Sequence, residues 1–231
     1  MVFHYVTPQF WDIKIIIMLH KIVFNPVVLF PLNALVLLML VIIADSYILT
    51  AGFYSAALAN SGLDLNPDLL HIDERFKIFL YTVSVLLLFL KYTLITLLLY
   101  TGIYLNGTRV SYFSVFKIVC ISEMIFLVPA VIKVIWFMYY PPAGIQEWQY
   151  FYPLSLLSIF RDQDLSGFAV YPLQLLNVFE FIYVLTLGYL LRNLLRSEKD
   201  NALGIVLVSY LPGLFVWALL VSYYTVMINP A

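Results

Sequence analysis

Five long apolar runs dominate this chain of 231 residues and leave few folds open to it. A helix needs about 20 mostly apolar residues to cross a bilayer, because the hydrocarbon core is about 30 Å thick and each residue adds about 1.5 Å. No run alternates in the manner of a membrane barrel. We therefore expect an all-α polytopic integral membrane protein, a bundle of five transmembrane helices. The expected spans are residues 27–48, 78–105, 115–139, 171–191 and 202–228.

The composition points to the same environment. Hydrophobic side chains make up 64% of the chain and charged ones only 11%, whereas soluble domains average about 25% charged residues. This excludes a water-soluble enzyme, since too few polar residues remain to cover its surface. The formal net charge of -1 provides no field that would attract nucleic acid, so we expect the lipid bilayer as a partner and no nucleic acid.

The residues before the first span read as neither a signal peptide nor a span, because Asp12, Lys14 and Lys21 interrupt the apolar run. We assign residues 1–26 to a cytoplasmic, interfacial segment with a short surface helix from Phe10 to Phe24. Residues 27–231 then form the five-helix transmembrane domain.

The stretch between the first two spans, residues 51–77, is acidic. Within it, Asn66 and Pro67 have the pattern of an N-cap followed by the first residue of a helix. This pattern predicts a helix there that lies on the membrane surface.

The distribution of Lys and Arg predicts the orientation, since basic residues in short loops are retained on the cytoplasmic side. The N-terminal segment and the loops at 106–114 and 192–201 carry most of them. The loops on the other side, at 51–77 and 140–170, are rich in Asp and Glu. We expect a cytoplasmic N-terminus and a C-terminus outside, in a bacterial inner membrane.

Three charged residues, Lys91, Glu123 and Glu180, lie inside the expected spans. A charge there costs about 2.5–3.5 kcal/mol on insertion scales, so such residues usually face protein, water or each other. Counting about 1.5 Å per residue from the cytoplasmic ends places the two carboxyl groups roughly level, with the Lys one side-chain length away. We expect a buried polar and charged cluster of Lys91, Glu123, Glu180 and Asn177.

Two interpretations of this cluster stay open. The simpler one is an ion pair, or a neutral carboxyl group, that fixes helix packing. The other is a proton or ion relay, because two carboxylates near one ammonium group titrate together. Pro129 and the pair Pro212-Gly213 also predict kinks in the third and fifth spans.

Catalytic patterns are missing from the sequence. His4, His20 and His71 are far apart, and the chain has neither a G-x-S-x-G turn nor a phosphate-binding glycine loop. The single Cys120 excludes an intrachain disulfide. We expect no enzyme, no catalytic residues, no metal site and no cofactor.

Three sequence features resemble the Yip1-domain family of membrane proteins in its bacterial branch. One is the lead into the first span, residues 15–19 and then Phe24-Asn25-Pro26. The others are the entry to the third span at residues 112–117, and the entry to the fourth at 168–173, which a basic loop and a fifth span follow. The resemblance implies a five-span fold and no catalytic residues. The long cytosolic region and D-L-Y-G-P motif of eukaryotic members are absent.

For the function, we expect a membrane scaffold or accessory subunit that associates with another membrane protein or with itself. Spans rich in Phe, Tyr and small polar residues suit such lateral helix contacts. The alternative is a small transporter or channel subunit that uses the buried Lys and Glu charges. The two differ in whether these charges line a cavity or a dry interface.

Overall fold

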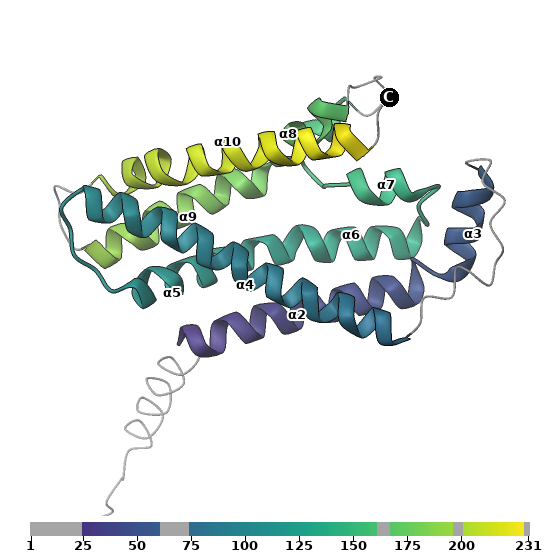
Figure 1. Cartoon of the computed structure of the whole chain (residues 1–231), viewed down its shortest axis with the longest axis horizontal. Helices are drawn as coiled ribbons and strands as arrows, with labels where there is room; N and C mark the ends of the chain where they lie inside the picture. The colour runs from purple at the N-terminus through teal and green to yellow at the C-terminus, as the bar shows by residue number, and fades with distance from the viewer. Residues whose placement is uncertain (1–24, 61–73, 161–166, 196–200, 229–231) are drawn as a thin grey trace, which may run out of the picture.

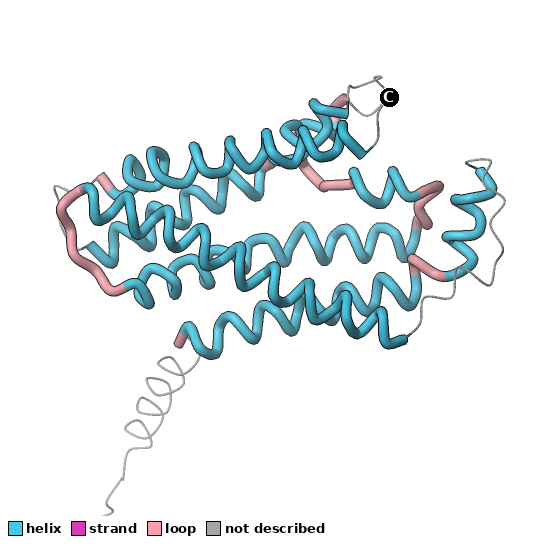
Figure 2. Tube along the Cα trace, viewed as in Figure 1, coloured by secondary structure: helices cyan, strands magenta, loops and turns pink. Residues whose placement is uncertain are grey.

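The computed structural model describes residues 25–60, 74–160, 167–195 and 201–228, and these are almost entirely helical (Figures 1 and 2). The helices expected from Phe10 to Phe24 and after Asn66 fall outside these ranges. In chain order the helices are α2 Pro26–Tyr47, α3 Ala51–Asn60, α4 Glu74–Leu105, α5 Tyr112–Glu123, η2 Met124–Phe126, α6 Leu127–Tyr139, α7 Ile145–Tyr150, η3 Leu156–Ser158, α8 Gly167–Leu175, α9 Val178–Leu195 and α10 Ala202–Ile228.

Five helical stretches in the described ranges are long and apolar enough to cross a membrane. They are Pro26–Tyr47, Arg75–Leu105, Tyr112–Tyr139, Val178–Leu195 and Ala202–Met227. The all-α, five-helix membrane fold expected from the sequence is therefore confirmed. The protein is a multi-pass membrane protein.

Two helices begin where asparagine side chains satisfy their first N–H groups. Asn25 Oδ1 accepts from the Val27 N–H at 3.1 Å, and Pro26 takes the first helical position of α2. Asn201 Oδ1 accepts from the Gly204 N–H at 3.0 Å at the start of α10. Such caps satisfy N–H groups that have no partner inside the helix, which explains why these starts were readable from the sequence.

The third span is interrupted near its middle. Between α5 and α6 the α-helix is replaced by the 3-10 turn η2, and Pro129 follows in the first turn of α6. Proline lacks an N–H and its ring clashes with the carbonyl group four residues earlier, so the expected irregularity at Pro129 is present. The fifth span, in contrast, continues as one helix through Pro212.

The fourth span differs from the single helix expected over residues 171–191. Helix α8 ends at Leu175, and α9 starts at Val178 and continues to Leu195. The expectation of one continuous helix is wrong because Asn177 ends one helix and caps the next. The apolar run alone carries no sign of this break.

The bundle packs tightly where α4, α5, α9 and α10 meet, and we call this part the closed half (Figure 1). Its core side chains include five that are fully buried, Ile103, Val115, Val119, Leu187 and Val206.

Glycine brings α4 and α10 close together in the same region. A Cβ atom on Gly102 would lie 2.7 Å from Ser209 Cβ. Small residues allow this approach of two membrane helices, so the closed half has little internal space.

The other part, which we call the split half, is divided. There α8 packs on the second part of α10, whereas α6 packs on α2 (Figure 1). A small second core of Ala44, Ile48, Val134 and Phe137 joins α6 to the end of α2, with Trp148 of α7 against it.

Candidate functional site

An ion pair connects two spans near the middle of the bundle. Lys91 Nζ lies 2.7 Å from Glu123 Oε2, and Lys91 stands near the middle of the 31-residue span Arg75–Leu105. The Glu123 side chain is 2% exposed, whereas that of Lys91 is 47% exposed. The ammonium group also lies 4.8 Å from the centre of the Phe126 ring, a distance at which a cation attracts the face of an aromatic ring.

Glu180 stands beside this pair but has a different partner. The Tyr210 hydroxyl donates to Glu180 Oε1 at 2.7 Å, and the carboxyl group lies within electrostatic range of both Lys91 and Glu123. Glu180 belongs to the first turn of α9, where the helix dipole favours a negative charge. The structure thus brings the three charges of the expected cluster together, with one direct pair among them.

Asn177 joins the two parts of the fourth span. Its Nδ2 donates to the carbonyl oxygens of Gln174 and Leu175 at 3.1 and 2.9 Å, and its Oδ1 accepts from the Glu180 N–H at 2.8 Å. One amide side chain therefore closes α8 and caps α9. Asn177 holds the Glu180 backbone, and all three of these bonds stay within its own span.

A non-helical segment pairs with this break. The Leu156 N–H donates to Leu176 O at 2.9 Å, and the Val178 N–H donates to Leu154 O at 3.2 Å. Leu154 has a φ of +57°, which is strained for a branched residue and is often found at functional sites. The two hydrogen bonds thus fix the segment before η3 against the break between α8 and α9.

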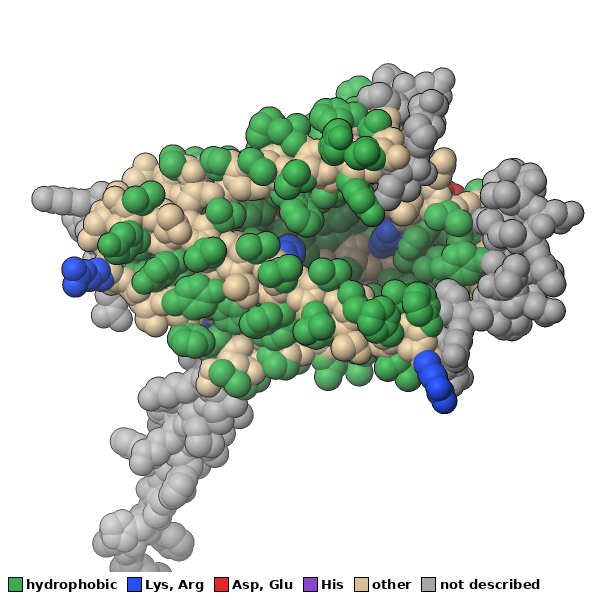
Figure 3. Space-filling view, viewed as in Figure 1, with side chains coloured by type: hydrophobic (Ala, Val, Ile, Leu, Met, Phe, Trp, Pro, Cys, Tyr) green, Lys and Arg blue, Asp and Glu red, His purple; other side chains and the backbone are tan. Residues whose placement is uncertain are grey.

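The surface is hollowed between α10 and α4, and Figure 3 shows basic side chains inside the hollow. We call this hollow the crevice. Lys91 on α4 is half-exposed, is paired with Glu123 on α5 and lies within electrostatic range of Glu180 on α9. The crevice lies at the boundary between the two halves, because its charged residues stand on α4, α5 and α9, beside the apolar core of the closed half.

Three tyrosines complete the polar surroundings. Burial and then the nearby carboxyl groups of Glu180 and Glu123 raise the pKa of Tyr152, which keeps its phenol neutral. The rings of Tyr183 and Tyr210 lie 5.4 Å apart. Sequence reasoning missed all three, because tyrosine is common in the spans and resembles a packing residue there. The capping pattern Asn177-Val178-Phe179-Glu180 was the available signal for the break.

A second polar group lies at the far end of the split half. Lys77 Nζ is 2.9 Å from Asp45 Oδ2, and the Tyr81 hydroxyl donates to the same oxygen at 3.0 Å. Lys133 contacts the Trp148 ring at 4.5 Å.

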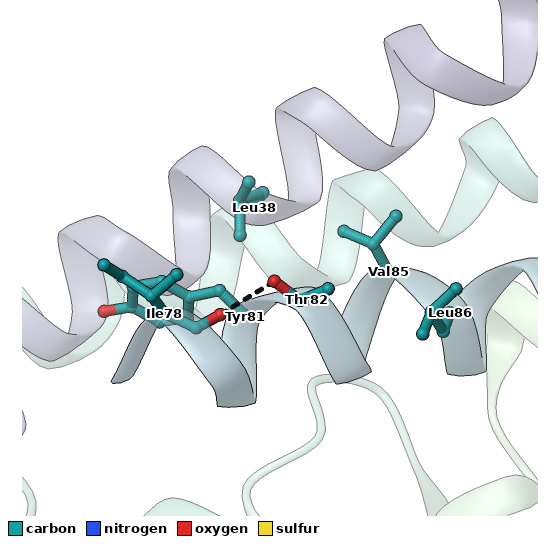
Figure 4. A pocket seen from close by; sticks show the side chains of 6 residues that line it. All are labelled: Leu38, Ile78, Tyr81, Thr82, Val85 and Leu86. Carbon is teal, nitrogen blue, oxygen red and sulfur yellow. Dashed lines mark hydrogen bonds between the residues drawn. The ribbon is translucent and has the colours of Figure 1, made fainter. Parts of the chain in front are cut away.

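An apolar groove runs between α2 and α4 beside this end of the bundle (Figure 4). Two hydroxyl groups line the groove, those of Tyr81 and Thr82. The Thr82 hydroxyl donates to Ile78 O at 2.9 Å within α4. The groove therefore suits a lipid chain and offers little to a polar solute. Its lining residues are Leu38, Ile78, Tyr81, Thr82, Val85 and Leu86.

No group of three or more His, Cys, Asp or Glu side chains able to hold a metal ion occurs in the described part of the chain. Comparisons with protein-family models, with curated proteins and with solved structures found no match to this chain.

Proposed function

We propose that the protein is a small membrane transporter or transporter subunit whose substrate site is the crevice. The observation that carries this proposal is the break between α8 and α9 at Leu176 and Asn177, next to the charges of Lys91, Glu123 and Glu180. Broken helices that meet at mid-membrane are a recurring way to build transporter sites.

The unequal packing of the two halves supports the same proposal. The crevice exposes Lys91, whereas the closed half next to it is sealed by side chains with almost no exposed surface. A site open on one side and sealed on the other suits a carrier rather than a continuous channel. Exchange of access would require the closed half to loosen while the split half closes.

The proposal assigns a role to each residue of the cluster. Lys91 and Glu123 form the fixed pair, and Glu180 is the carboxyl group without a cation directly bonded to it. Asn177 is a positioning residue, because it holds the first turn of α9 that carries Glu180.

The proposal is tested with purified protein in liposomes that contain a pH-sensitive dye. A pH gradient should drive proton flux through wild-type protein, and Glu123→Gln with Glu180→Gln should abolish it. Asp45→Asn is the matched control, because this carboxyl group lies outside the crevice and pairs with Lys77. No flux above that of empty liposomes, or equal flux in the double variant, would reject the proposal.

A scaffold or accessory subunit is the second candidate, and one observation favours it. Lys91 is half-exposed on a lateral face, where a helix of a partner protein, or of a second copy, would shield it from lipid. Purification in mild detergent should then recover a stoichiometric partner or a homo-oligomer, and Lys91→Met should release it. A monomer without partners would exclude this candidate.

We also infer that the chain is Yip1-like and resides in a bacterial inner membrane with its N-terminus in the cytoplasm. The basic residues at Arg109 and Arg192 and the pattern of five spans support this inference. A reporter that is active only outside the cytoplasm should work when fused after Ala231 and fail when fused near Arg196. The reverse result would reject the orientation.

A further inference from the structure

We infer that the crevice binds a hydrophobic monovalent cation in exchange for a proton that Glu180 holds when the cation is absent. The inference rests on the proposed transport function and names its class of substrate. It follows from the charges around Glu180, from the partners of the two carboxyl groups, and from the walls and opening of the crevice.

The charges at the crevice do not balance when both carboxyl groups are ionised. Lys91 contributes one positive charge, whereas Glu123 and Glu180 contribute two negative ones. Lys133 packs on the Trp148 ring and is not among the groups whose charge acts on Glu180. An uncompensated charge is costly at membrane depth, so the group favours one further positive charge, which either a proton or a cationic ligand supplies.

The partners of the carboxyl groups decide which one exchanges its proton. Glu123 is bonded directly to the Lys91 ammonium group at 2.7 Å, so its carboxyl group already has a cation as a partner. Glu180 accepts from a neutral donor instead, the Tyr210 hydroxyl. Glu180 is also partly exposed, whereas Glu123 is buried. Glu180 therefore is the carboxyl group that can both hold a proton and meet a ligand.

The groups that face Glu180 come from every neighbouring element. They are Tyr183 on α9 itself, Tyr210 on α10, Tyr171 on α8, Tyr152 in the segment before η3, Lys91 on α4 and Glu123 on α5. Four of these six are phenols, which are uncharged but present aromatic faces. Lys91 is held by Glu123, so the charge of Glu180 is left for a ligand.

The walls of the crevice suit a cation with apolar substituents. Aromatic rings attract cations, and the attraction is stronger when water is excluded. The indole N–H of Trp217 donates to the Tyr171 hydroxyl at 2.9 Å, which fixes a further pair of rings near the break. Because the hollow opens on a lateral face (Figure 3), a ligand dissolved in the bilayer can enter without crossing water.

The exchange conserves charge and breaks one O–H bond. The cation enters, the proton on the Glu180 carboxyl group passes to water, and the resulting carboxylate pairs with the cation. Neither oxidant nor reductant is involved. The coupling is reciprocal, so protonation of Glu180 should expel the cation.

The test uses the purified full-length protein in detergent and tetraphenylphosphonium as the probe. Calorimetry in buffers of different ionisation enthalpy should show binding with release of about one proton per cation, and tighter binding as the pH rises. Tetraphenylborate, an anion of similar size and shape, should bind at least about tenfold more weakly, a difference of about 1.4 kcal/mol. Equal binding of the two probes, or cation binding without proton release, would overturn the inference.

Variants locate the exchange at Glu180. Glu180→Gln should weaken tetraphenylphosphonium binding at least about tenfold and abolish proton release, whereas Asp45→Asn should leave both unchanged. Should Glu180→Gln fail to fold, Glu180→Asp keeps the charge and must still release a proton. Unchanged binding and proton release in Glu180→Gln, or a loss of proton release in Asp45→Asn, would contradict the inference.

The inference and the proposed function fail separately. Cation binding with proton release, but no proton flux in liposomes supplied with tetraphenylphosphonium, would reject transport and retain the site. Proton flux that depends on the two glutamates without cation binding would retain transport and reject this class of substrate.

Discussion

The closed half and the split half are built from the same apolar helices but differ in what fills the space between them. In the closed half, small residues bring α4 and α10 together and aliphatic side chains such as Leu187 and Val206 fill the interior. In the split half, α8 packs on α10 and α6 packs on α2, and a hollow with basic side chains in it lies between α10 and α4.

The difference shows how a small membrane protein can hold a polar site. The closed half stabilises the bundle through packing, which is the main source of helix association in lipid. Because this packing stabilises the fold, the protein tolerates costly features elsewhere, namely a charged pair, a broken helix and the strained backbone of Leu154. We expect stability to depend mainly on the first region and function on the second.

The largest effect is expected from a core truncation in the closed half. Leu187→Ala should lower the free energy of unfolding by about 2–5 kcal/mol, because rigid neighbours cannot fill the resulting cavity. Leu157→Ala, the matched change outside the closed half, should cost less, because Leu157 lies in the short turn η3 and is 8% exposed, whereas Leu187 is fully buried. Unfolding in mixed detergent micelles measures both. Equal losses would remove the distinction between the halves.

Lys91→Met should have the next largest effect on stability. Breaking a fully buried ion pair lowers the free energy of unfolding by about 3–5 kcal/mol. Because Lys91 is half-exposed, we expect a smaller loss here, of about 2–3 kcal/mol. The loss arises because Glu123 is left buried without its cation. Glu123→Gln in the same chain should recover part of it, and a double variant no more stable than Lys91→Met would show that the pair is not the cause.

Asn177→Ala should lower the free energy of unfolding by about 1–2 kcal/mol, the usual cost of a lost N-cap with further bonds to the preceding helix. The larger consequence should be functional, since Glu180 loses the group that holds its N–H. Proton flux in liposomes should fall more than stability does. Asn201→Ala, which removes the cap of α10, is the matched control and should leave the flux unchanged.

The smallest effects distinguish two tyrosines at the boundary between the halves. Tyr210→Phe removes a donor to Glu180 and should cost about 1–2 kcal/mol. Tyr183→Phe should change the free energy of unfolding by less than about 0.5 kcal/mol, because this buried hydroxyl has no hydrogen-bond partner among the described residues. Thermal unfolding of both variants in detergent makes the comparison, and an equal loss in both would indicate a bond between Tyr183 and Glu123.

Several features of the fold were readable from the sequence because they depend on neighbouring residues. Pro26 and Asn201 mark the starts of α2 and α10, and Pro129 marks the irregular turn in the third span. The break before Val178 was missed although Asn177 and Glu180 have the spacing of a cap, because the apolar run that surrounds them reads as one helix.

The sequence by itself determined the five spans and the presence of Lys91, Glu123 and Glu180 within them, because the length and polarity of a segment decide whether it can cross lipid. Only the tertiary structure decided that Lys91 pairs with Glu123 and that Tyr210 bonds Glu180. The rotation of each helix about its axis selects these partners. That rotation is set by packing between helices distant in the chain, which the polarity of a single segment does not encode.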